Sequence, residues 1–416
     1  MATVKTKRLR SLGRDQRGDR VKPISADSHV VEGPEVFAGL AERFGDDAPR
    51  IMNTETEVDA IVIPSKGIRG PGAARLGLAG MRLREGNSVE RRPGHKPEVD
   101  NLTAPDMAAL IAKGYDGLRP GIVDGARRHE DQDADGLALE FLYPGFFGMF
   151  SFENVDLLVA CQKNYNDWLY DYANAAGGRL HGLAAIPVQH PEEARAELER
   201  VIKRGFKGGC IPCSSPADRP YRDEAYDPIW ALAEEAGFPL SMHVGTNAYV
   251  PAEYRSRQPV RDGVAEYSIA PTTVQRTLAE LMCRGVAERF PALKFVVAEF
   301  NGGWIAHWID RLDQGLLREW RFREEKFVGT RPQEIWRRQF YATIEDDRPA
   351  LLTRDLIGVE NLMWGSDYPH TDSTFPCSLE VLDELFEGIG DDVRAKITRD
   401  NVKRLYGAVS YTHLTL

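Results

Sequence analysis

From about residue 136 onward, short runs of β-branched and apolar residues alternate with longer stretches of helical pattern. This alternation limits the chain to few folds, because strands that alternate with helices form βαβ units around a parallel sheet. One further strand pattern precedes the regular part. The expected strands are Ile24–His29, Leu139–Tyr143, His181–Pro187, Phe206–Pro212, Phe238–His243, Lys294–Glu299, Phe340–Ile344 and Leu362–Asp367.

Helical patterns fill the spaces between these strands. The segment from Pro191 begins with acidic residues and ends with Lys203 and Arg204, the charge order that the helix dipole favours. Eight strands with interleaved helices predict a (β/α)8 barrel of the TIM type, and a doubly wound open sheet is the alternative. The expected helices are Val155–Ala176, Pro191–Arg204, Asp227–Ala236, Pro271–Arg289, Gly303–Arg318 and Arg348–Leu356.

Three segments fall outside the regular pattern. Residues 50–135 are rich in Gly, Arg and Pro and lack clean periodicity, so we interpret them as an irregular insertion after the first strand. Residues 1–20 carry seven basic and two acidic residues and no apolar signal-peptide core, which predicts a disordered basic tail. Residues 408–416 continue no pattern and resemble a non-native tail. Residues 21–407 then form one barrel domain.

The composition limits the kinds of partner and compartment that we expect for this chain. The net charge of −10 and a pI near 5.5 argue against nucleic acid as a partner. No apolar run approaches the roughly 18 residues that a membrane-spanning helix needs. The five cysteines are scattered and odd in number, which favours a reducing compartment, and we expect a cytoplasmic protein.

Polar residues end several of the expected strands. In a barrel, chemistry is found at the carboxyl ends of the strands. An Asp-x-His pair in an extended strand places both side chains on one face, so Asp27 and His29 point into the barrel mouth together. His243 ends the fifth strand and Asp367 ends the eighth. Two imidazoles with carboxylates, and a position left for water, predict a site for one catalytic divalent metal.

Each of these residues has a structural explanation when taken alone. A histidine at a strand end is often a hydrogen-bonded core residue, and Asp367 before Tyr-Pro is compatible with a simple turn. The order and spacing of the four residues together favour the metal site. Glu299, at the end of the sixth strand, and His370, just beyond the eighth, are further candidates for proton transfer or substrate contact.

These motifs resemble the amidohydrolase superfamily, in particular the amidohydrolase-related branch that includes aminocarboxymuconate-semialdehyde decarboxylase and aromatic-acid decarboxylases. The resemblance spans residues 21–407, with residues 50–130 poorly matched. It is carried by the motifs Ser25–His29, Met242–Gly245, Ala298–Trp304 and Trp364–His370, and by Asp133–Gly136 leading to Leu142–Pro144.

The resemblance implies a ligand set. Its positions fall on Asp27, His29, His243 and Asp367, where Asp27 replaces the histidine commoner in the family. The position that often carries a sixth-strand histidine carries Glu299. The metal expected first is zinc, and the carboxylate at position 27 leaves manganese or iron open. The fourth strand offers no bridging lysine or glutamate at its carboxyl end, which favours one metal over two.

Several functions fit this resemblance. We expect a metal-dependent hydrolase acting through an activated water on a small carbonyl- or carboxylate-bearing molecule, with Asp367, His243, Glu299 and His370 as catalytic residues. The alternative is a metal-dependent non-oxidative decarboxylase of an aromatic or unsaturated acid. An iron-containing oxygenase and a non-catalytic partner subunit are further alternatives, and a homodimer is compatible with the resemblance.

Overall fold

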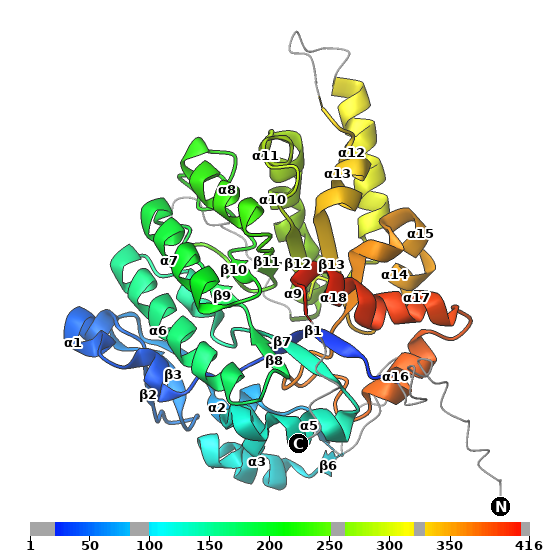
Figure 1. The fold of residues 1–416 in the computed structure, drawn as a ribbon. Coiled ribbons are helices and arrows are strands. Elements are labelled where there is room, and N and C mark those ends of the chain that lie inside the picture. The colour runs from blue at the N-terminus through cyan, green and yellow to red at the C-terminus, as the bar shows by residue number, and fades with distance from the viewer. Residues whose placement is uncertain (1–20, 84–99, 251–262, 320–328, 409–416) are drawn as a thin grey trace, which may run out of the picture.

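The computed structural model describes residues 21–83, 100–250, 263–319 and 329–408. Its strands form a barrel of parallel staves enclosed by helices (Figure 1). The short strands of two sheets follow the expected order around the barrel, and the consecutive strands β8 and β9 together form one of its eight positions, here called staves. The staves are β1 (Ile24–His29), β7 (Leu139–Tyr143), β8 (Leu180–Gly182) with β9 (Ala184–Ala185), β10 (Gly209–Ile211), β11 (Leu240–His243), β12 (Phe295–Ala298), β13 (Phe340–Ile344) and β14 (Leu362–Trp364).

Backbone hydrogen bonds join these strands into a ring. The order β1-β7-β8 and the order β9-β10-β11-β12-β13-β14 are each parallel throughout, and Leu183 connects the two parts. On the other side, the amide of Asp367 donates to the carbonyl of Asp27 at 2.9 Å, and the amide of His29 donates to the carbonyl of Tyr368 at 2.6 Å. The predicted barrel is therefore confirmed and the open sheet is excluded.

The helices follow the expected positions with two differences. The predicted helix 271–289 is two helices, interrupted at Gly285, whose φ of 91° lies in the left-handed region. The predicted helix 348–356 is likewise divided, at Thr353. The helices are α6 (Val155–Asn174), α7 (Pro191–Arg204), α8 (Asp227–Glu235), α9 (Gly263–Ile269), α10 (Pro271–Cys283), α11 (Val286–Arg289), α12 (Ile305–Glu319), α13 (Pro332–Gln339), α14 (Arg348–Leu352), α15 (Arg354–Ile357), α16 (Ser378–Leu385), α17 (Asp391–Ala395) and α18 (Asn401–Tyr406).

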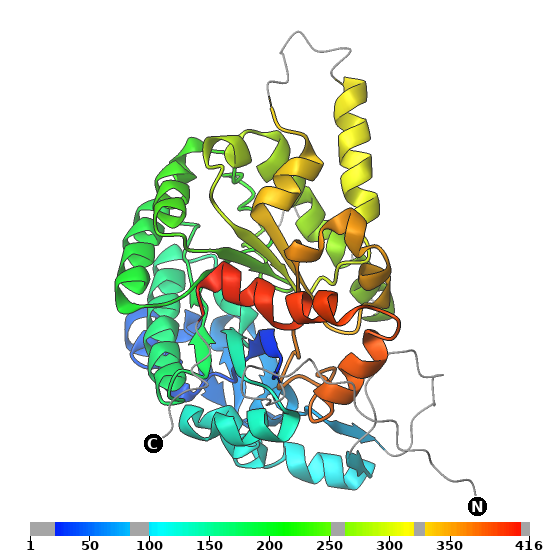
Figure 2. The ribbon, with the colours of Figure 1, turned by 45° about the vertical axis from the view of Figure 1, so that its right-hand side comes forward.

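The period-two alternation of the strands decides which side chains reach the barrel interior. In β11, Leu240 and Met242 pack in the apolar cluster formed with the surrounding helices. Ser241 and His243 must then face inward, because successive residues point to opposite sides of a strand. The C-terminal helices lie across the strands in Figure 2. Tyr406, in α18, stacks on Phe141 of β7 with 4.2 Å between the ring centroids.

The segment interpreted as an insertion contains regular elements that its sequence pattern did not reveal. It forms a small antiparallel sheet, a parallel strand pair and short helices, drawn blue and cyan in Figure 1. Its last helix, α5, lies directly before the second stave. The elements between the first two staves are α1 (Leu40–Phe44), β2 (Arg50–Met52), β3 (Ala60–Ile63), β4 (Ile68–Gly72), α2 (Ala73–Leu76), β5 (Met81–Leu83), β6 (Asp100–Leu102), α3 (Ala104–Ile111), α4 (Pro120–Val123) and α5 (Arg128–Asp135).

Both predicted tails fall outside the description of the fold. Residues 1–20 and residues 409–416 lie beyond the described ranges, so the structure says nothing of either prediction. Within the described residues, no helix combines the length and apolar character needed to cross a bilayer.

A buried carboxylate connects the insertion to the last part of the barrel. Asp135, 3% exposed at the end of α5, accepts hydrogen bonds from the amide and the hydroxyl of Ser378 at the start of α16, at 2.9 and 2.5 Å. Burial raises the pKa of Asp135 to about 7, despite the lowering effect of these hydrogen bonds.

We predict a stability difference from this shift. An acid with a raised pKa binds more protons in the folded than in the unfolded chain, so its contribution to stability falls as pH rises from about 4 through 7. Between pH 6 and 8 the free energy of unfolding should fall by about 1.4 kcal/mol more in wild type than in Asp135→Asn. Urea unfolding at both pH values measures this, and an equal pH dependence in the two proteins would contradict it.

Candidate metal centre and active site

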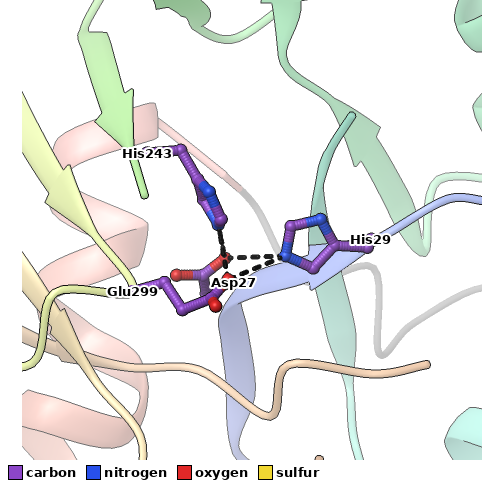
Figure 3. A group of neighbouring side chains, drawn as sticks. All are labelled: Asp27, His29, His243 and Glu299. Carbon is purple, nitrogen blue, oxygen red and sulfur yellow. Dashed lines mark ion pairs between the residues drawn. The ribbon is translucent and has the colours of Figure 1, made fainter. Parts of the chain in front are cut away.

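Four candidate side chains meet at the carboxyl ends of three staves. Asp27 and His29 project from β1, His243 from the end of β11, and Glu299 from the residue after β12 (Figure 3). The Nε2 atom of His243 lies 2.9 Å from Glu299 Oε2 and 3.4 Å from Asp27 Oδ1. The Nε2 atom of His29 lies 3.3 Å from Glu299 Oε2 and 3.8 Å from Asp27 Oδ1.

Backbone carbonyls fix the orientation of the two imidazole rings through the ring nitrogens that face away from the cluster. His29 Nδ1 donates to the carbonyl of Pro144 at 2.9 Å, and His243 Nδ1 donates to the carbonyl of Val244 at 2.8 Å. A carbonyl can only accept, so the ring proton of each histidine sits on Nδ1 in the neutral form. The Nε2 lone pairs then point to the centre of the cluster, which is how metal-binding histidines are held in proteins.

The donor set fits a divalent cation. Asp27 Oδ1, His29 Nε2, His243 Nε2 and Glu299 Oε2 are buried atoms without a hydrogen-bond partner. Ligand atoms of these four residues lie within 4.8 Å of one another. Buried polar atoms are nearly always paired, and one cation at their centre would satisfy all four. Two imidazoles and two carboxylates suit zinc, manganese or iron.

Asp367 and His370 form a second group on the same side of the barrel. Asp367 Oδ1 lies 3.3 Å from His29 Nε2 and 2.9 Å from His370 Nδ1. The ring of His370 stacks on that of His29, with 4.1 Å between centroids. All six residues expected at the site are thus brought together. One group of four side chains that could hold a metal ion contains Glu299 with Asp27, His29 and His243, and Asp367 belongs to a second such group with His29, Glu299 and His370.

The carboxylates of the cluster shift the pKa values of its histidines, and the histidines shift those of the carboxylates. Burial lowers the pKa of His243, but Glu299 and Asp27 outweigh it and raise this pKa to about 9. The pKa of His29 is raised for the same reason, by Asp367 and Glu299. Burial and Asp367 raise the pKa of Glu299, yet the two histidines prevail and lower it to about 2. His370 and His29 likewise hold the pKa of Asp367 below its usual range, against its burial. The centre attracts positive charge.

The backbone is strained at two of these residues. Glu299 has a φ of 59° and Asp367 a φ of 57°, a left-handed conformation uncommon for residues other than glycine. Hydrogen bonds hold both in place. The amide of Glu299 donates to Thr343 Oγ1 at 2.8 Å, and the amide of Asp367 donates to the Asp27 carbonyl. Strain of this kind gathers at functional sites, where surrounding structure maintains it.

Two residues that the sequence reasoning missed support the ligands. Thr343, facing inward from β13, donates to Asp27 Oδ2 at 2.7 Å and so leaves Oδ1 to face the cluster. Arg128, fully buried at the start of α5, pairs with Glu140 through two hydrogen bonds at 2.9 and 3.0 Å. Its guanidinium also donates to the carbonyls of His29 and Tyr368, at 3.2 and 3.3 Å, where the first and last staves meet.

A small cavity opens beside Asp367. Its volume is about 20 Å³, which is room for a water-sized group. Two of the lining carboxylates were not among the predicted site residues. Glu345 follows β13 directly, so a search for polar residues at strand ends could have found it. Asp372 lies two residues beyond His370, in a loop, where no such signal exists. The described lining residues are Asp27, Tyr267, Glu299, Asn301, Thr343, Ile344, Glu345, Gly365, Asp367 and Asp372.

The family follows from the sequence profile that matches this barrel. The profile of the amidohydrolase family matches residues 113–408, which is more than half of the chain and includes His243, Glu299 and Asp367. The chain belongs to the amidohydrolase family. The resemblance seen in its motifs is confirmed, and this amidohydrolase is a metal-dependent enzyme, either a hydrolase or a decarboxylase.

Curated relatives of this amidohydrolase are decarboxylases by name. The gamma-resorcylate decarboxylase of Polaromonas sp. strain JS666 is 27% identical over 261 residues, which cover 59% of this chain and 75% of that protein. The gamma-resorcylate decarboxylase of Rhodococcus jostii strain RHA1 is 25% identical over 259 residues, with the same coverage.

Solved structures share the fold. An amidohydrolase, map2389c, from Mycobacterium avium subsp. paratuberculosis K-10 superposes with a TM-score of 0.68 at 21% identity, covering 93% of this chain and 99% of that one. A 5-carboxyvanillate decarboxylase from Novosphingobium aromaticivorans, complexed with manganese and 4-hydroxy-3-methoxy-5-nitrobenzoic acid, superposes with a TM-score of 0.63 at 18% identity, covering 95% and 99%. The barrel is therefore the amidohydrolase barrel.

We predict that Thr343→Val weakens metal binding. Valine keeps the shape but removes the hydroxyl that orients Asp27 and accepts from the Glu299 amide. The dissociation constant for Mn²⁺ should rise about 10–100-fold. Titration of metal-free protein measures this, with His307→Ala, an exposed histidine of α12, as the matched control. Equal affinity in wild type and Thr343→Val would contradict the role of Thr343.

Proposed function

We propose that this amidohydrolase is a metal-dependent decarboxylase that releases CO2 from an aromatic carboxylic acid. The sequence alone favoured hydrolysis and kept decarboxylation as the alternative. The observation that carries the change is the match, over 59% of the chain, to enzymes named gamma-resorcylate decarboxylase. The clustered histidines and carboxylates are compatible with decarboxylation and with hydrolysis alike, because both mechanisms require a divalent ion.

The ligands in this proposal are Asp27, His29, His243 and Glu299, with Asp367 beside them. We propose manganese in place of the zinc first expected, because the carboxylate-rich donor set suits it and a decarboxylase of the same fold was solved with manganese. When bound, the ion supplies a positive charge that orients the substrate's carboxylate and a neighbouring oxygen and stabilises negative charge in the transition state.

The protein's own contribution is a positioned proton. When the bond to the carboxylate breaks, its electron pair remains on the ring carbon, CO2 departs and that carbon must receive one proton. Asp367 and His370 share a proton through their 2.9 Å hydrogen bond. Since His370 is 19% exposed and Asp367 is buried, the imidazole can exchange protons with solvent while the carboxylate faces the reacting atoms.

The histidine side of the site is buried and partly apolar. The imidazoles of His29 and His243 are completely buried, and Phe147 packs against them with ring centroids 5.8 and 5.0 Å away. An apolar wall at this point disfavours a free attacking water and provides a surface for an aromatic ring.

The reaction itself is the test. Manganese-loaded protein, given a panel of benzoates hydroxylated beside the carboxylate, should release CO2 and, in D2O, place one deuterium on the vacated ring carbon. Mass spectrometry follows both products. Hydrolysis of amides or lactones without CO2 release from any aromatic acid would contradict the proposal and restore hydrolysis as the function.

His370→Gln separates proton transfer from metal binding. Glutamine can hydrogen-bond to Asp367 but cannot carry the proton, so kcat should fall about 10²–10⁴-fold. Metal content by elemental analysis should remain that of wild type, and His307→Gln serves as the control. A wild-type kcat in His370→Gln would remove His370 from the mechanism.

A further inference from the structure

Glu32 is a buried carboxylate outside the groups of described residues that could hold a metal ion. It lies three residues after His29, in the segment that follows β1, and is 1% exposed. Its Oε1 atom accepts hydrogen bonds from the backbone amides of Gly145 at 2.8 Å and of Phe146 at 3.0 Å. The side chain of Glu32 therefore holds the beginning of the loop that follows β7.

The first residue of this loop orients a candidate metal ligand. The carbonyl of Pro144 accepts the hydrogen bond from His29 Nδ1 at 2.9 Å, and this bond decides where His29 Nε2 points. Gly145, whose amide donates to Glu32, is the next residue in the chain. A shift of the peptide between Pro144 and Gly145 would move the acceptor of His29 as well. The bond between Glu32 and Gly145 therefore acts on the orientation of His29.

The last residue of the loop forms the aromatic wall of the site. The ring of Phe147 packs against the rings of His29 and His243, at 5.8 and 5.0 Å between centroids. It also lies close to the backbone after β11, since a Cβ on Gly245 would stand 2.7 Å from Phe147 Cδ2. Phe146, the second donor to Glu32, directly precedes this ring. The two amides that Glu32 holds thus lie between the acceptor of His29 and the aromatic wall.

Both sides of this contact are fixed by further packing. A Cβ on Gly145 would stand 2.3 Å from the carbonyl oxygen of Val30 and 3.0 Å from Glu32 Oε2, so the loop lies directly against the segment after β1. The insertion holds the backbone of Glu32 itself. The hydroxyl of Tyr115 donates to the Glu32 carbonyl at 2.6 Å, and the amide of Tyr115 donates to Asp59 Oδ2 at 2.9 Å. Glu32 therefore connects the insertion to the loop after β7.

We propose that Glu32 is a positioning residue for the metal centre and for the aromatic wall of the substrate site. It acts through the loop 144–147 and not by contact with the metal or the substrate. The inference deepens the proposed function, on which its activity readout rests, while its effect on His29 is measured without turnover. Both amides need an acceptor at Oε1, so the role requires an oxygen and not a negative charge. Glutamine can therefore replace Glu32, and alanine cannot.

Two variants of Glu32 test this role. In Glu32→Ala the dissociation constant for Mn²⁺ should rise about tenfold, and kcat/KM of the manganese-loaded protein with a 2-hydroxybenzoate should fall by a similar factor. Glu32→Gln keeps the acceptor and should stay within about threefold of wild type in both. Glu35→Ala, which changes an exposed glutamate of the same segment, is the matched control. Wild-type affinity and kcat/KM in folded Glu32→Ala would overturn the inference.

The ring proton of His29 separates positioning from a general loss of stability. We follow it by NMR in metal-free protein with ¹⁵N-labelled histidine. In Glu32→Ala the His29 Nδ1 proton should exchange with solvent about tenfold faster than in wild type, because its bond to Pro144 is loosened. The Nδ1 proton of His243, which is bonded to the Val244 carbonyl, is the internal reference and should change less than about twofold. Equal acceleration at both histidines would overturn the inference and assign Glu32 a structural role.

A milder variant keeps the test decisive if Glu32→Ala does not fold. Tyr115→Phe removes only the hydroxyl at the Glu32 carbonyl, and it should raise the dissociation constant for Mn²⁺ about threefold and speed proton exchange at His29 but not at His243. Wild-type values of both in Tyr115→Phe would then overturn the inference. The changed exchange at His29, with no CO2 released from any aromatic acid, would contradict the proposed reaction alone and support the positioning role.

Discussion

The site depends on the seam where the first and last staves of the barrel meet. Two backbone hydrogen bonds, from Asp367 to Asp27 and from His29 to Tyr368, close the ring at the residues that carry the chemistry. Arg128 reinforces this seam from the insertion, because its guanidinium donates to the carbonyls of both His29 and Tyr368 while Glu140 neutralises it. The same hydrogen bonds therefore close the barrel and position the candidate ligands.

Sequence reasoning succeeded where the signal was local and periodic. The eight staves and the inward direction of Asp27, His29 and His243 follow from strand alternation and from the position of polar residues at strand ends. It located His370 and Glu299 for the same reason. The close approach of Glu299 to both histidines could not be read from the chain, because it depends on the left-handed backbone at Glu299 and on the hydroxyl of Thr343, which accepts from the Glu299 amide.

The contributions of the insertion were also beyond local reasoning. Arg128 and Asp135 lie in a helix that the residue pattern did not reveal, and both act on distant segments. Arg128 reaches β1 and the loop after β14, and Asp135 reaches α16. Such contacts are tertiary, so no periodicity within residues 50–135 could indicate them. The division of the 271–289 helix at Gly285 is a smaller example, since a left-handed glycine became decisive only in the packed structure.

The buried carboxylates of the site are stabilised by the imidazoles beside them, and a bound cation would neutralise more of their charge. Without a cation, the cluster holds the pKa values of its histidines high and those of Glu299 and Asp367 low. The most direct measurement is a manganese anomalous difference map from a crystal of the metal-loaded protein. The account predicts a strong peak among Asp27 Oδ1, His29 Nε2, His243 Nε2 and Glu299 Oε2. A peak elsewhere in the barrel mouth, or none at full manganese saturation, would contradict it.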